Sequence, residues 1–169
     1  MAVSSKNAPL VAAVLIGSLA LGVGITKVTG YWKTEASKVP VKIAEGEFAG
    51  MPDPGDIRGS YSFANIEATF GVPAPILAEA FGLSGKDPGE YLAKELETVW
   101  EGAAGEWEVG TDAVRLFTSL WTGLPHEPAA TTALPSTAVE ALLSAGKIDG
   151  KRAETLNVVR AGKAGDPAE

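Results

Sequence analysis

The chain has 169 residues, enough for one domain of ordinary size with an appended segment. It contains no cysteine, which excludes disulfide bonds, thiolate metal sites and cysteine-ligated iron–sulfur clusters. Residues 1–34 carry three lysines and no acidic residue, whereas residues 35–169 carry eleven basic and twenty-one acidic residues. Such a negative surface repels phosphate, so we expect no nucleic-acid partner.

A run of twenty uncharged residues between Lys6 and Lys27 predicts a transmembrane helix, with residues 1–30 forming an N-terminal membrane anchor. About twenty residues at 1.5 Å each cross a hydrocarbon layer of roughly 30 Å. A cleaved secretory signal is the alternative, although the run lacks a clear small-x-small cleavage site. A short span before a large acidic domain is typical of a signal anchor. We therefore expect a single-pass protein of the inner (cytoplasmic) membrane with its domain on the periplasmic side.

Small residues recur four positions apart within this run, as Ala13 with Gly17 and Ser18 with Gly22. This spacing lets a second membrane helix approach closely. We expect these four residues to contact other membrane subunits, while the rest of the anchor faces the lipid bilayer.

Residues 31–59 are predicted to be a tether that ends in a proline- and glycine-rich loop. The only short strand candidate, VKIAEGEF, lies in this segment. Residues 60–162 are predicted to form a helical extramembrane domain, and residues 163–169 a disordered tail.

Helix start and stop signals divide residues 60–162 into five or six helices. Ser62 is expected to cap the first helix and Gly71 to end it, while Pro75 begins the second and Gly82 ends it. A third helix is predicted to open at Asp87-Pro88 and to run through residue 100, because apolar residues recur there at helical spacing.

Three further helices are predicted with side-chain caps at Thr111, Ser136 and Asp149. Strand signals are otherwise nearly absent. The sequence therefore predicts an all-α fold, consisting of a single N-terminal transmembrane helix followed by a small multi-helix soluble domain.

The residues offer little basis for catalysis. His126 is the only histidine and lies in a proline-rich loop, where we expect it to be exposed. Eight acidic residues fall between Asp87 and Asp112 against the single base Lys94, but they lack the alternating pattern of a calcium loop. A solvated acidic face is expected instead. We predict no enzyme activity, no catalytic or metal-binding residue and no cofactor.

Residues 57–83 form a distinct pattern of two short helices joined by a glycine-proline turn. The residues that carry it are Ile57, Arg58, Gly59, Phe63, Ile66, Phe70, Gly71, Pro73, Leu77, Phe81 and Gly82. The pattern resembles a helical tail module attached to NapH-like ferredoxin-type and cytochrome b-like bacterial membrane redox proteins. The iron–sulfur cysteines of those proteins are absent here, so no cluster or electron-carrying role carries over. The resemblance implies an accessory position beside a redox complex.

We therefore expect a non-catalytic accessory or structural subunit of a bacterial membrane electron-transfer complex, respiratory or photosynthetic, which braces its extracytoplasmic side. The acidic region is expected to attract a basic soluble electron carrier, because opposite charges raise encounter rates. The residues predicted to bind partners outside the anchor are Arg58, Tyr61, Glu90, Glu97 and Glu101.

The alternative is a free-standing, membrane-anchored envelope module that binds a peptide or glycan. Such a module needs exposed aromatic side chains in the helix pair of residues 57–83 or near it. The candidates are Tyr61, Phe63 and Trp107.

Overall fold

The computed structural model describes residues 39–160, which fold around a small helical core. The α-helices are α2 (Phe63–Phe70), α3 (Ala74–Ala80), α4 (Glu95–Val99), α5 (Thr111–Thr122), α6 (Ser136–Ser144) and α7 (Gly150–Ala153). Two 3-10 helices, η2 (Pro54–Asp56) and η3 (Pro88–Glu90), and two short strands, β1 (Leu134–Pro135) and β2 (Val158–Val159), complete the described elements.

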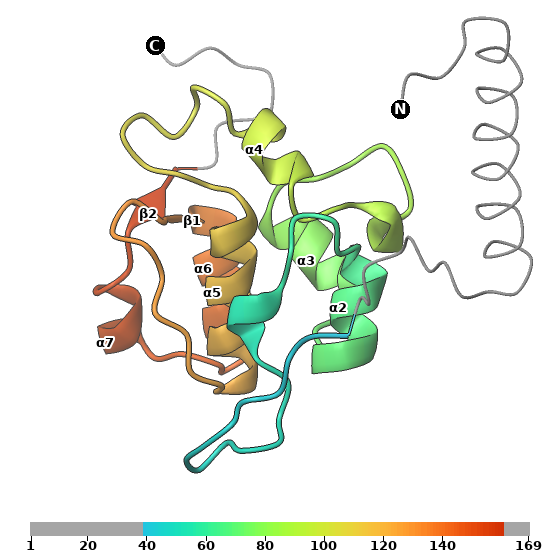
Figure 1. Ribbon diagram of the computed structural model, residues 1–169. Coiled ribbons are helices and arrows are strands. Elements are labelled where there is room, and N and C mark those ends of the chain that lie inside the picture. The colour runs from blue at the N-terminus through green and yellow to red at the C-terminus, as the bar shows by residue number, and fades with distance from the viewer. Residues whose placement is uncertain (1–38, 161–169) are drawn as a thin grey trace, which may run out of the picture. The chain divides into compact units, whose positions relative to one another are not determined.

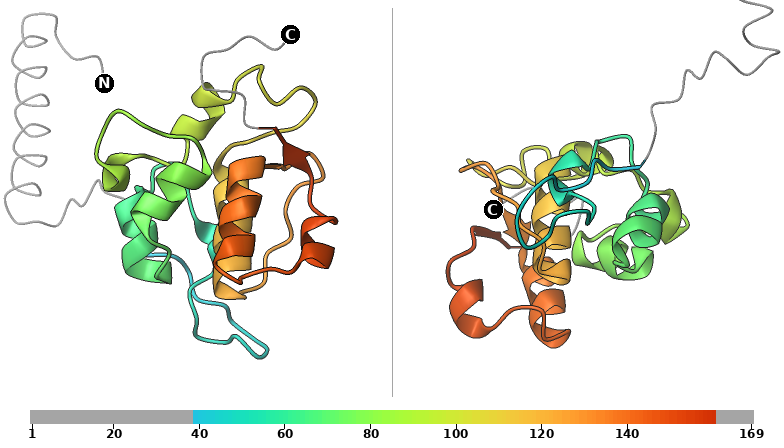
Figure 2. Two further views of the ribbon diagram at one scale, coloured as in Figure 1. Left: turned by 180° about the vertical axis from the view of Figure 1, so that it is seen from behind. Right: turned by 60° about the horizontal axis from the view of Figure 1, so that its bottom comes forward.

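The helices form two adjoining groups (Figures 1 and 2). α2 and α3 pack together on one side, and α5 and α6 pack together on the other. Contacts between α3 and α6 join the two groups. The short helix α4 lies at one end of this arrangement, and the hairpin of residues 41–53 leaves it at the opposite end.

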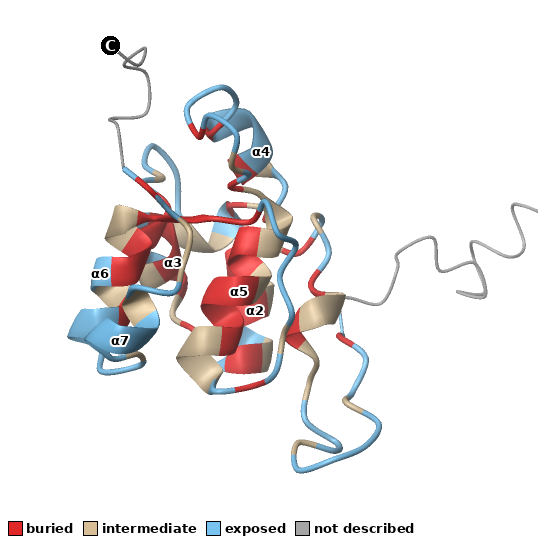
Figure 3. Cartoon of the chain, turned by 90° about the vertical axis from the view of Figure 1, so that its left-hand side faces the viewer, coloured by how far each residue is buried: buried red, intermediate tan, exposed pale blue. Residues whose placement is uncertain are grey.

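Helix α5 provides much of the core (Figure 3). Six of its twelve residues are buried, which gives it more buried positions than a surface helix with one apolar stripe. The Phe117 ring lies 5.8 Å from the rings of both Phe81 and Trp121, measured between centroids. The Phe117–Phe81 contact packs α5 against the end of α3, and the Phe117–Trp121 contact lies within α5.

The predicted helix caps are confirmed where the chemistry is local. The Ser62 hydroxyl accepts from the Asn65 backbone N–H, and the Asn65 side chain accepts from the Ser62 N–H, forming a capping box at the start of α2. Gly71 ends α2 with φ of 69°. The Asp149 carboxylate accepts from the Arg152 N–H at the start of α7.

The predicted third helix is wrong over its first half. The chain forms η3 and then runs extended before α4 begins. The Phe63 N–H donates to the Tyr91 carbonyl at 2.9 Å, and the Ala93 N–H donates to the Tyr61 carbonyl at 3.0 Å. These bonds to a distant segment replace the helical bonds that the apolar spacing predicted, so tertiary contacts override the local pattern here.

Two other predicted caps differ from the structure. Thr111 is the first residue of α5, and Gly110 holds the N-cap position with no side-chain cap bond. Ser136 is likewise the first residue of α6, with Pro135 in the N-cap position. Each helix thus begins one residue earlier than its predicted cap allows.

The predicted all-α class is contradicted by a parallel pair of strands. Leu134 pairs with Val158, and Pro135 pairs with Val159. The Leu134 N–H donates to the Asn157 carbonyl at 2.9 Å. Each strand has only two residues, too few for an alternating pattern to be visible in the sequence. VKIAEGEF forms no named strand, but Lys42 makes an isolated bridge with Pro52.

The predicted single-pass, inner-membrane location is also contradicted. Within residues 39–160, no helix is long and apolar enough to cross a bilayer. The segment that was expected to span the membrane, residues 1–30 with Ala13, Gly17, Ser18 and Gly22, lies outside the described residues, as does the tail at 163–169. We therefore withdraw the membrane location.

Gly71 offers a test of the helix stops. A Cβ at this position would meet no atom within 4 Å, so its positive φ is the main obstacle to substitution. We expect Gly71→Ala to lower the free energy of unfolding by about 1–2 kcal/mol, because an L-residue is strained in the left-handed region. Denaturant unfolding followed by circular dichroism measures the change.

Gly150→Ala is the matched control. Gly150 is the first residue of α7, also has open space around it, and does not have a positive φ in the strained range. We expect this variant to be neutral or more stable by up to about 1 kcal/mol. Equal destabilisation by the two variants would contradict the assignment of Gly71 as a conformational stop.

Candidate functional site

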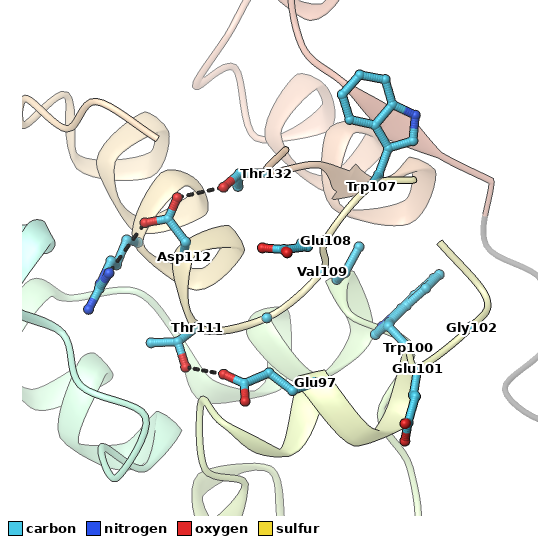
Figure 4. A pocket seen from close by; sticks show the side chains of 12 residues that line it. Glu97, Trp100, Glu101, Gly102, Trp107, Glu108, Val109, Thr111, Asp112 and Thr132 are labelled. Atoms are coloured by element: carbon cyan, nitrogen blue, oxygen red, sulfur yellow. Dashed lines mark hydrogen bonds and ion pairs between the residues drawn. The ribbon is translucent and has the colours of Figure 1, made fainter. Parts of the chain in front are cut away.

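A pocket lies between the end of α4, the loop that follows it and the start of α5 (Figure 4). Its volume is about 600 Å³. Its lining consists of Glu97, Trp100, Glu101, Gly102, Trp107, Glu108, Val109, Gly110, Thr111, Asp112, Arg115 and Thr132. The pocket is therefore built mainly from the acidic segment noted in the sequence.

A close approach of α4 to the start of α5 forms the base of this pocket. A Cβ added at Gly110 would lie only 2.9 Å from the Glu97 Cγ. The Glu97 carboxylate in turn accepts a hydrogen bond from the Thr111 hydroxyl at 3.1 Å. Glycine at 110 thus allows Glu97 to lie against the helix start, where its negative charge is also favoured by the helix dipole.

Backbone pairing holds the opposite part of the loop. The Glu108 N–H donates to the Thr131 carbonyl at 2.8 Å, and the Ala133 N–H donates to the Glu108 carbonyl at 3.0 Å. These bonds attach residue 108 to the segment leading into β1. The Glu108 side chain remains exposed and lines the pocket.

Asp112 accepts hydrogen bonds from four donors, one in α5 and three in the loop of residues 126–132. Its Oδ2 accepts from the Thr132 hydroxyl at 2.6 Å and from the Ala129 N–H at 2.9 Å. Its Oδ1 accepts from His126 Nε2 at 3.0 Å and from Arg115 Nη1 at 3.4 Å. The carboxylate therefore fastens the loop of residues 126–132 to the start of α5.

The same bonds set the acidity of Asp112. Burial alone would raise the pKa of this carboxyl group. The hydrogen bonds from Thr132 and Ala129, the nearby His126 and the bond from Arg115 outweigh burial and hold the pKa below its ordinary value. The folded state therefore favours the ionised carboxylate of Asp112 over the protonated acid.

His126 does not match its expected exposure. Its side chain is only 9% exposed because it lies against Asp112. Histidine and aspartate are two of the three residue types of a hydrolytic triad, whose serine hydroxyl bonds to the histidine. The Ser119 hydroxyl instead donates to the Leu124 carbonyl at 2.7 Å. The described contacts of His126 are therefore those of a structural clasp.

The residues predicted to bind partners outside the anchor lie in different surroundings. Glu97 and Glu101 both line the pocket, whereas Glu90 is exposed at the end of η3 and is not part of it. Arg58 is exposed and lies 3.4 Å from Asp56. Tyr61 is 1% exposed, so it offers no surface for a partner.

Burial also raises the pKa of the Tyr61 phenol, with a further contribution from the Asp56 carboxylate and an opposing one from Arg58. Its hydroxyl is one of two buried side-chain polar atoms without a hydrogen-bond partner in the described part of the chain. Tyr61 is a core residue, contrary to its predicted surface position.

Several pocket residues were missed as site candidates from the sequence. Glu108 and Asp112 were noted only as part of an acidic face, Trp100 only as a helix residue, and Thr132 not at all. The cluster of acids was the available signal. The cluster of acids could not reveal the contact between residues 108 and 132, because this contact joins loops more than twenty positions apart.

The site shows no arrangement suited to a metal ion. Among residues 39–160, no group of three or more histidine, aspartate or glutamate side chains could hold one. Comparisons with protein-family models, curated proteins and solved structures find no match for the chain. The resemblance carried by residues 57–83 stays a prediction.

Asp112 generates a test of the clasp. We expect Asp112→Asn to lower the free energy of unfolding by about 2 kcal/mol at neutral pH, because charge-assisted hydrogen bonds are lost. The pKa of Asp112 is lower in the folded than in the unfolded state, so its stabilisation is complete above pH about 4. It is lost as the pH falls through the folded-state pKa. Denaturant unfolding of both proteins across this range measures the difference.

Glu127→Gln serves as the control, since Glu127 is exposed beside His126. We expect its unfolding free energy to stay within about 0.5 kcal/mol of the unaltered protein at every pH. A difference between Asp112→Asn and the unaltered protein that did not vary with pH would count against a charge-dependent clasp.

Proposed function

We propose that residues 39–160 form a non-catalytic accessory domain that binds a basic partner protein through the acidic pocket. The observation that carries this proposal is the charge of the lining, with four carboxylates and one guanidinium group. In its narrower form, which rests on the resemblance of residues 57–83 alone, the partner belongs to a redox complex or is a basic soluble electron carrier.

The negative charge is only partly neutralised by neighbouring side chains, because Asp112 alone among the four carboxylates forms an ion pair in the described part of the chain, with Arg115 at 3.4 Å. Glu97 and Asp112 are held by hydrogen bonds, but Glu101 and Glu108 have no ion-pair partner within residues 39–160. The single cation, Arg115, is already engaged, with Nε donating to the Ile57 carbonyl at 2.8 Å. A positively charged partner surface would form ion pairs with the carboxylates that the fold leaves unpaired.

An acidic surface of this kind favours fast, salt-dependent association. Opposite charges steer the encounter of two proteins, and salt screens them over about 8 Å at physiological ionic strength. The same charges repel phosphate, which supports the expectation that nucleic acid is not the partner.

The glycan- or peptide-binding alternative has less support. Two of its three aromatic candidates, Tyr61 and Phe63, are buried at 1% and 0% exposure. Only Trp107 retains partial exposure, and it lies at the acidic pocket. The helix pair of residues 57–83 thus presents neither Tyr61 nor Phe63 to a ligand.

Glutamine substitutions at the pocket test the proposal. We expect the double variant Glu101→Gln/Glu108→Gln to lose affinity for a basic partner by roughly tenfold, since each exposed charge pair contributes up to about 1 kcal/mol. The measurement is quantitative mass spectrometry of proteins that co-purify with the tagged full chain at low and raised salt. Absorbance of the bound fraction then shows whether the partners carry redox cofactors.

Glu45→Gln/Glu47→Gln provides the matched control. These two exposed residues lie in the hairpin at the end opposite α4, and the variant changes the net charge by the same amount. The proposal requires that basic partners be lost from the pocket variant and kept by the control. Partners retained equally by both variants, or the recovery of the protein alone, would refute it.

A further inference from the structure

Beside the pocket, the chain runs from a turn into β1 over residues 130–134. Within this segment Thr132 lines the pocket, and its hydroxyl donates to the Asp112 carboxylate at 2.6 Å (Figure 4). Backbone groups of successive residues in an extended chain point to opposite edges, so the two edges of the segment have different partners. The partners of each edge decide where Thr132 lies.

The loop that carries Glu108 bonds to one edge of this segment. The Glu108 N–H donates to the Thr131 carbonyl at 2.8 Å, and the Ala133 N–H donates to the Glu108 carbonyl at 3.0 Å. The Glu108 side chain lines the pocket. The position of this carboxylate therefore depends on where residues 131–133 lie.

Asn157 bonds to the other edge with both its side chain and its backbone. Its Nδ2 donates to the Ala130 carbonyl at 3.2 Å and to the Thr132 carbonyl at 3.1 Å. Its own carbonyl accepts from the Leu134 N–H at 2.9 Å. A side-chain amide has two N–H groups, and each of them has a carbonyl partner here. One residue thus holds the segment at three points.

The side chain of Asn157 reaches a part of the segment that β2 does not. β2 pairs with Leu134 and Pro135. Val159 of β2 is buried, which fixes the strand to the core. From this anchored position the amide reaches Thr132, the residue beside the pocket. The bonds of Asn157 therefore do more than attach β2 to the domain.

We infer that Asn157 is a positioning residue for the acidic pocket, which acts through the backbone of residues 130–132. Asp112 holds the side chain of Thr132, whereas Asn157 holds the backbone of the same residue from the edge that faces away from Glu108. The position of Glu108 follows, because its own backbone bonds to this segment. The inference rests on the proposed function for its consequence, which is that partner binding requires the pocket to keep this geometry.

Asn157→Asp tests the positioning without the partner. The change is nearly isosteric, but it places a carboxylate, which only accepts, against two carbonyl oxygens. We expect hydrogen exchange of the Glu108 and Ala133 amides in the ¹⁵N-labelled full chain to become about tenfold faster at neutral pH, because two hydrogen bonds are lost. The amides of Phe63 and Ala93, which bond between two other segments, should keep their rates.

For partner binding, positioning and charge predict opposite signs. Asn157→Asp adds a negative charge, so charge alone would leave unchanged or raise the recovery of basic partners with the tagged full chain. Displacement of the segment should instead lower this recovery by roughly threefold, because the pocket is no longer preorganised. Thr155→Asp is the matched control, since Thr155 is exposed, its hydroxyl bonds to Arg152, and the variant adds the same charge. We expect this control to match the unaltered protein in its exchange rates and to keep its basic partners.

The outcomes separate this inference from the proposed function. The inference is overturned if Asn157→Asp leaves exchange at Glu108 and Ala133 unchanged, or if exchange at the two reference amides rises equally. It is also overturned if this variant keeps the basic partners that Glu101→Gln/Glu108→Gln loses. Should the unaltered protein recover no basic partner, the proposed function fails by itself. Selective exchange at Glu108 and Ala133 would then still uphold Asn157 as the residue that positions the segment.

Discussion

The geometry of the pocket depends on one carboxylate. Asp112 lies at the start of α5 and receives hydrogen bonds from Thr132, Ala129, His126 and Arg115. Thr132 belongs to the segment that pairs with the backbone at Glu108. The position of the Glu108 loop relative to α5 therefore follows from the bonds of Asp112. The network is partly buried, and its hydrogen bonds reinforce one another because they meet at a single carboxylate.

Helix α5 connects this network to the core. Its first turn holds Asp112, its middle buries Val114 and Phe117, and Arg115 between them donates to the Ile57 carbonyl. The helix that positions the pocket is thus also the helix that the aromatic contacts hold in place. Rigid placement matters for a binding site, because side chains on an ordered helix lose less conformational entropy when a partner binds.

Features of the fold that depend on a few adjacent residues could be predicted from the sequence, and those that depend on distant contacts could not. The Ser62 cap, the Gly71 stop and the Asp149 cap each arise within one helical turn. The extended segment at Tyr91 and the pairing of Leu134 with Val158 depend on partners more than twenty positions away, and no local pattern encodes them. For the site, composition indicated the acidic region and included Glu97 and Glu101. It could not show the cavity, because Gly110, Trp107 and Thr132 acquire their roles only when the two loops meet.

The pocket collects carboxylates that the fold does not use. Glu101 and Glu108 line the same pocket as Glu97 and Asp112, and no cation within residues 39–160 forms an ion pair with either of the first two. Selection for stability alone favours neutral or oppositely charged residues at such positions. Glu101 and Glu108 make no ion pair among residues 39–160, so their charges are available to a partner of opposite charge, which is the property on which the proposed function depends.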